Sequence, residues 1–115
     1  MRILIFSLFI GMASVSSTIH AADQSITLND FELWSTTYAT DTIRVFPTGI
    51  PVNNSSCSGA GSNPDSYMVK TTLSPAAISR IYATLLSAKM SGKPVVIYTS
   101  GCEDNRPAIL TVMIK

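Results

Sequence analysis

Hydrophobic positions follow different patterns in different parts of the chain. Residues 3–12 form a mainly apolar run, apolar and polar residues alternate in segments between 26 and 73, and apolar residues recur every three or four positions from 78 to 90. Alternation is typical of half-buried β-strands, and the longer repeat is typical of an amphipathic helix. The pattern predicts a mainly β domain with one helix, preceded by a separate apolar segment.

The apolar segment at the start is typical of a secretory signal peptide. Arg2 gives a positive start, an apolar run of about 10 residues follows, and small residues lead to Ala21 and Ala22. A spanning helix needs roughly 20 apolar residues, so this run is too short to be one. We expect residues 1–22 to be removed, leaving residues 23–115 as one secreted or periplasmic domain without a membrane anchor.

Three strands are expected before the helix. Residues 26–38 and 42–46 are rich in Thr, aromatic and branched side chains, and a turn at 38–41 would join them as a hairpin. Residues 47–64 are rich in Gly, Ser, Asn and Pro, which indicates a long surface loop. Alternation then resumes over residues 65–73.

The helix has clear start and stop signals. The Ser74 hydroxyl can accept a hydrogen bond from a free backbone N–H, and Pro75 suits the first helical position. Gly92 can adopt the left-handed conformation that ends a helix. The predicted apolar stripe comprises Ile78, Ile81, Tyr82, Leu85, Leu86 and Met90.

Two further strands, residues 94–99 and 108–114, are expected around a polar loop at 100–107. The resulting order β-β-β-α-β-β favours an OB-type five-stranded Greek-key barrel. A ferredoxin-like fold would need a helix after the first strand, and an immunoglobulin-like sandwich would need about seven strands.

Cys57 and Cys102 are the only cysteines, and export would place them where a disulfide persists. Closing a loop of about 45 residues stabilises a chain by roughly 4 kcal/mol in the chain-entropy model. A redox or metal pair is the alternative. It is disfavoured because there is no C-x-x-C spacing, and the only histidine, His20, lies in the leader.

Composition excludes several functions. Of the eight basic residues only Arg2 lies in the leader, so seven remain beside seven acidic ones, without the basic cluster that nucleic-acid binding needs. Without histidine, the usual acid–base and nucleophilic triads cannot form. We therefore expect no enzyme, no cofactor and no metal. A hydrolase using Glu103 and Asp104, or a calcium site adding Asn105, matches no recognised spacing.

The segment from Ser74 to Lys115 carries a family resemblance. It contains L-L-x-A-x-x-S-G-K-x-V from Leu85 to Val95 and S-G-C from Ser100 to Cys102. This half resembles the B subunits of bacterial AB toxins of the cholera-toxin and subtilase-cytotoxin kind, and a group of small exported bacterial proteins of unassigned activity. The resemblance implies an OB-fold protomer with one disulfide, a homopentameric ring lined by helices, glycan-receptor binding and a catalytic A subunit as partner.

Five residues are candidates for ligand binding. In OB folds the loops after the first and fourth strands flank the ligand face, and the only indole could stack on a sugar. The alternatives are that the indole packs in the core and that Arg106 forms a surface ion pair with Glu103 or Asp104. We expect a non-catalytic glycan-binding module, the alternative being an exported monomer that binds or inhibits a protein. The candidates are Trp34, Tyr38, Asp104, Asn105 and Arg106.

Overall fold

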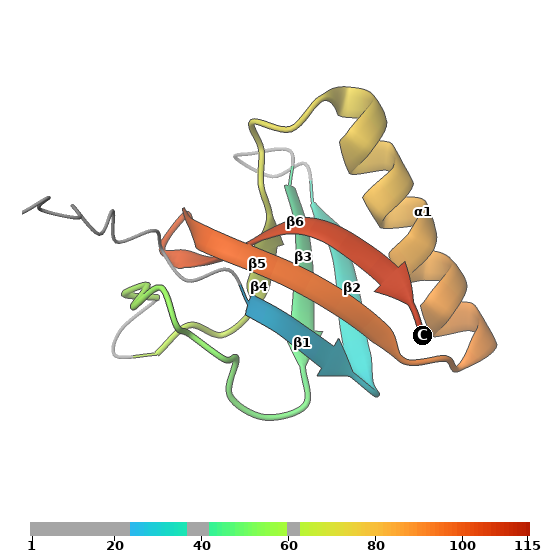
Figure 1. Cartoon of the computed structure of the whole chain (residues 1–115), viewed down its shortest axis with the longest axis horizontal. Coiled ribbons are helices and arrows are strands. Elements are labelled where there is room, and N and C mark those ends of the chain that lie inside the picture. Colours follow the sequence, from blue (N-terminus) through green and yellow to red (C-terminus); the bar gives the residue numbers. More distant parts are fainter. Residues whose placement is uncertain (1–23, 37–41, 60–62) are drawn as a thin grey trace, which may run out of the picture.

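A computed structural model describes residues 24–36, 42–59 and 63–115 (Figure 1). The described residues form a mainly β structure with one helix and a single six-stranded sheet, as the sequence predicts in outline. The elements in chain order are β1 (Gln24–Leu28), β2 (Phe31–Thr36), β3 (Thr42–Pro47), β4 (Tyr67–Val69), α1 (Pro75–Ser91), β5 (Val95–Glu103) and β6 (Arg106–Ile114).

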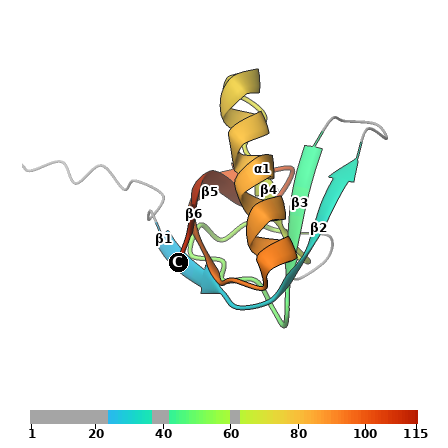
Figure 2. The ribbon, with the colours of Figure 1, turned by 90° about the vertical axis from the view of Figure 1, so that its right-hand side faces the viewer.

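The sheet has the strand order β1-β5-β6-β4-β3-β2, and its pairs are antiparallel except for β4 with β6. β1 and β2 lie at opposite ends of this order, although only Asn29 and Asp30 separate them in the chain. Three residue steps span at most about 11 Å. The sheet must therefore curl until its two edges approach each other at Asn29 and Asp30, where Figure 2 shows the chain passing from β1 into β2.

The prediction of one strand over residues 26–38 was wrong, because the chain bends at Asn29 and Asp30. The Asp30 side chain accepts a hydrogen bond from the Phe31 N–H at 2.9 Å. Such local side-chain bonds compete with the strand ladder. The two halves then pair with different strands, β1 with β5 and β2 with β3, so the sheet has six strands instead of five.

The helix begins and ends as predicted. The Ser74 hydroxyl accepts from the Ala77 N–H at 3.1 Å, and Gly92 adopts a left-handed φ of 65°. The predicted stripe was wrong at Leu86 and Met90, which are 38% and 80% exposed, whereas Ala88 is buried. The buried face packs against the concave side of the sheet (Figure 2), and the core includes Val45, Tyr67, Leu85, Val95, Ile97 and Ile109.

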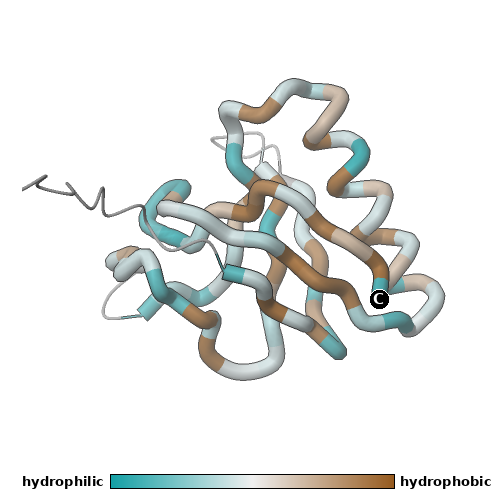
Figure 3. Tube along the Cα trace, viewed as in Figure 1, coloured by the Kyte–Doolittle hydropathy of each residue, from teal (hydrophilic) through white to brown (hydrophobic). Residues whose placement is uncertain are grey.

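The predicted loop at 100–107 is instead the end of a β-hairpin. β5 extends to Glu103 and β6 begins at Arg106, so Asp104 and Asn105 alone form the turn. Their φ angles of 47° and 61° are both positive, as a two-residue type I′ turn requires. This tip is the hydrophilic end of the hairpin in Figure 3. The third strand is shorter than predicted, covering only Tyr67–Val69.

The predicted disulfide between Cys57 and Cys102 is confirmed, with their Cα atoms 5.7 Å apart. It ties the loop after β3 to β5 and is compatible with an oxidising, exported location. Two hydrogen bonds cross the same junction, from the Gly101 N–H to the Ser55 hydroxyl at 3.1 Å and from the Gly59 N–H to the Asn105 carbonyl at 2.7 Å. The loop is therefore fixed beside the hairpin tip.

Candidate binding site

The side of the β2–β3 hairpin that faces away from the core carries two aromatic residues. Trp34 lies opposite Arg44, and Glu32 lies opposite Phe46, in the antiparallel register. Directly opposed residues point to the same side of a sheet, so these four side chains share one face. We call Glu32, Trp34, Arg44 and Phe46 the outer face.

Trp34 leaves 52% of its surface exposed, so it is not a core residue. Its ring centroid lies 4.9 Å from that of Phe46, with the ring planes tilted by 50°. Tilted aromatic pairs at this separation attract each other and restrain the two side chains. The outer face therefore presents a partly ordered aromatic surface to solvent.

A chain of ion pairs joins the outer face to the hairpin tip. Asp104 Oδ2 lies 3.5 Å from Arg44 Nη2 and 3.2 Å from Arg106 Nη1. Arg106 Nε donates to Asp65 Oδ1 at 2.7 Å, and this hydrogen bond holds the pKa of Asp65 below its usual 3.8, against the opposing effect of burial. Asp104 thus bridges two guanidinium groups from different strands.

The predicted binding residues of the turn occupy different environments. Arg106 is only 8% exposed, and its Nε and Nη1 atoms already donate to Asp65 and Asp104. Its position therefore suits a role in holding the turn, as the ion-pair alternative anticipated, although one partner is Asp65 and the guanidinium is buried beside two exposed carboxylates. Asp104 and Asn105 are exposed. Tyr38 lies outside the described residues.

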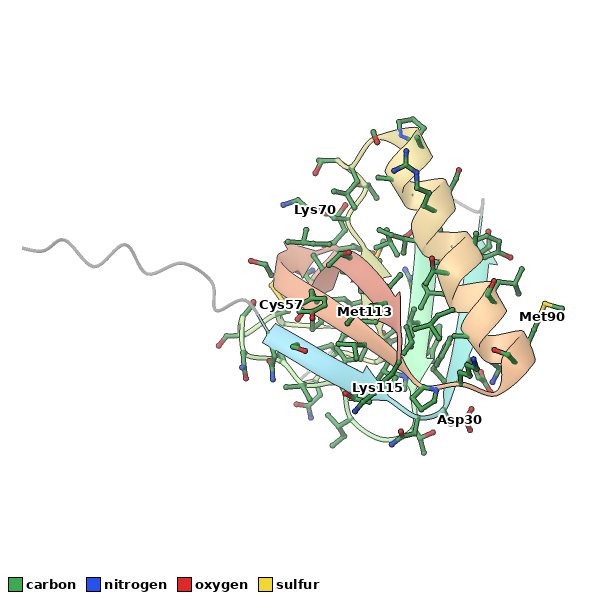
Figure 4. All side chains as sticks on the ribbon, turned by 45° about the vertical axis from the view of Figure 1, so that its right-hand side comes forward. Asp30, Cys57, Lys70, Met90, Met113 and Lys115 are labelled. Atoms are coloured by element: carbon green, nitrogen blue, oxygen red, sulfur yellow. A yellow bond between two sulfur atoms is a disulfide. The ribbon has the colours of Figure 1, made fainter. Side chains whose placement is uncertain are left out.

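A hollow of about 390 Å³ opens at the end of the outer face where β2 begins. Lys89 reaches it from α1, with its Nζ 3.3 Å from Asp30 Oδ1 and 5.7 Å from the centre of the Phe31 ring. Figure 4 shows Asp30 near the C-terminal end of the helix. The hollow is lined by Asp30, Phe31, Glu32, Phe46, Pro47, Thr48 and Lys89.

Sequence reasoning did not include Arg44, Phe46 or Asp65 among the binding candidates. Alternation within residues 42–46 places Arg44 on the other side of the strand from the buried Ile43 and Val45. The sequence therefore already indicated that Arg44 faces away from the core. The pairing of Asp65 with Arg106 spans 41 residues and had no local signal.

Other chemistry has little support among the described residues. No group of three or more His, Cys, Asp or Glu side chains there could hold a metal ion. The Glu103 carboxylate accepts a hydrogen bond from the Thr71 hydroxyl, and Asp104 is engaged by arginines. In this part of the chain, no helix is both long and apolar enough to cross a membrane.

Comparisons with protein-family models, curated proteins and solved structures find no match to this chain, so the toxin-subunit resemblance stays a prediction.

Proposed function

We propose that this protein is an exported, non-catalytic binding module that recognises glycans on its outer face. The observation that carries the proposal is the half-exposed Trp34 beside Phe46. An exposed indole in a small domain offers a flat apolar surface on which the C–H face of a sugar ring can stack. Polar groups around such a surface supply orientation and specificity.

The strand order supports an OB-type barrel as the finer fold. If β1 and β2 are the two halves of one bent first strand, the remaining strands follow in the OB order, with the third and fifth parallel. OB folds bind ligands on the face of strands two and three, between the loops after strands one and four. With this numbering, Arg44 and Phe46 lie on strand two and the Asp104–Asn105 turn is the loop after strand four, whereas Glu32 and Trp34 lie on the neighbouring strand one.

The toxin resemblance extends the proposal to assembly. A B-subunit role would require a ring of five protomers and a catalytic partner chain. Light scattering on size-exclusion chromatography of the oxidised protein tests the ring directly, since it would give about five times the protomer mass. A mass equal to one protomer would refute the ring but would not bear on glycan binding.

Binding itself is tested on a glycan array with two variants. We expect Trp34→Ala to abolish binding, because it removes the stacking surface. Tyr98→Ala is the matched control, since Tyr98 is also an exposed aromatic residue but lies on β5 and not on the outer face. Glycan binding that survives Trp34→Ala would refute the proposed site, and no binding by the wild-type protein would refute the function.

An exported protein-binding monomer is the second candidate, and one observation favours it. Ile50 is 75% exposed in the loop that the disulfide ties down, and Val52 nearby is also exposed. The Val52 N–H donates to the buried Tyr67 hydroxyl at 2.7 Å, so the loop is anchored. Two neighbouring exposed apolar side chains on an anchored loop provide a surface that a partner protein could cover.

A further inference from the structure

The cations near the outer face are paired with carboxylates, but one carboxylate on this face is not paired. Each nearby cation has a carboxylate partner, since Lys89 lies 3.3 Å from Asp30 and Arg44 lies 3.5 Å from Asp104. Glu32 is exposed and makes no hydrogen bond or ion pair with any residue in the described ranges. The hollow therefore holds one carboxylate free to accept hydrogen bonds from a ligand.

We propose that the ligand is a sugar without an acidic group, and that adjacent hydroxyls of this sugar donate hydrogen bonds to Glu32. This inference rests on the proposed glycan-binding function and specifies its substrate class. Glu32 lies two residues from Trp34 along β2, so their Cα atoms are about 6–7 Å apart on one face. Phe46 lines the hollow and also contacts Trp34, so the apolar and acceptor groups are contiguous.

Hydrogen bonds to an ionised carboxylate are stronger than neutral ones, and its two oxygens can accept from two donors at once. Neighbouring hydroxyls on a sugar ring match this arrangement. Thr48, on the rim of the same hollow, adds a hydroxyl that can donate or accept. The site thus combines an aromatic surface with a small number of convergent polar groups.

An acidic sugar fits this surface poorly. The carboxylate of the sugar would be repelled by the negatively charged Glu32, and the Lys89 ammonium is already paired with Asp30. Arg44 is the other cation, but its side chain is only 22% exposed and its Nε atom is buried without an acceptor among the described residues. A ligand carboxylate therefore finds no accessible, unpaired cation on the outer face.

The test uses pairs of glycans that share a neutral core and differ by one terminal sialic acid. Wild-type protein is expected to bind the neutral member at least about tenfold more tightly at low ionic strength. Glu32→Gln keeps a hydrogen-bond acceptor but removes the negative charge. It should therefore weaken binding of the neutral glycan roughly tenfold and reduce the preference for the neutral over the sialylated glycan. Glu103→Gln is the control, with the same change of charge at a carboxylate that bonds Thr71.

The outcomes separate this inference from the function on which it rests. Equal or tighter binding of the sialylated member, or an unchanged preference in Glu32→Gln, would overturn the inference while glycan binding stands. Wild-type protein that binds neither member of any pair would overturn both. Thermal melting of both variants confirms that each is folded, as expected for substitutions outside the hydrophobic core.

Discussion

The loss of stability on removing the disulfide can be calculated from the length of the loop that it closes. Replacing Cys57 with Ala and Cys102 with Ser opens a closed loop with a sequence separation of 45. The chain-entropy model assigns such a loop about 13 cal/mol/K, which is about 4 kcal/mol at 25 °C. The two hydrogen bonds across the junction remain available, but they form only in the folded state, so they do not restrict the unfolded chain as the cross-link does.

Urea unfolding followed by tryptophan fluorescence measures this loss. For a domain of this size, with a denaturant slope of about 1–2 kcal/mol per M, the midpoint should fall by roughly 2–4 M. Wild-type protein in a strong reductant is the matched control, because it loses the cross-link while keeping both sulfur atoms. It should unfold close to the double variant.

A loss below about 1 kcal/mol in both samples would refute the reasoning, since it would mean that the unfolded chain is already restricted without the bond. A large loss in the double variant alone would assign the effect to packing around the buried Cys57 and not to the cross-link.

Three further predictions concern stability. The folded state lowers the pKa of Asp65, so the ionised carboxylate should stabilise the fold fully above pH 3.8, and this stabilisation should disappear as the pH falls through the folded-state pKa. The melting temperatures of wild type and Asp65→Asn should therefore converge in acid. Leu85→Ala should cost about 2–5 kcal/mol in chemical denaturation because the side chain is fully buried, whereas Leu86→Ala, on the exposed side, should cost far less. Gly92→Ala should cost roughly 1–2 kcal/mol through its left-handed φ alone, since a Cβ there meets no atom within 4 Å; calorimetry showing no loss would contradict this.

Local signals predicted the elements that depend on neighbouring residues. The Ser74 cap, the Pro75 start and the Gly92 end each act within one turn, so the helix bounds could be predicted from sequence. The alternation over residues 42–46 likewise identified β3 and its buried face. The disulfide was predictable because the leader-like start of the sequence predicts export, which would place these two cysteines in an oxidising environment.

Features that depend on distant residues or on turn chemistry were missed. The bend at Asn29–Asp30 and the tight turn at Asp104–Asn105 both use side chains that favour turns, yet the local pattern predicts a continuous strand at the first and a longer loop at the second. The parallel pairing of β4 with β6 and the bridge from Arg44 to Asp104, 60 residues away, have no local pattern. The candidate site was therefore only partly predictable: Trp34, Asp104 and Asn105 were among the predicted candidates, but their connection through Arg44 was not predicted.

The double attachment of the hairpin tip has a thermodynamic consequence for recognition. A covalent bond fixes β5 from one side, and the Arg44–Asp104 pair joins the tip to the hairpin that carries Trp34. A ligand that binds there would meet groups that are already restrained in the folded protein, so less further ordering would oppose association. Free and occupied forms should accordingly superimpose closely, and affinity differences among ligands should reside in dissociation rates.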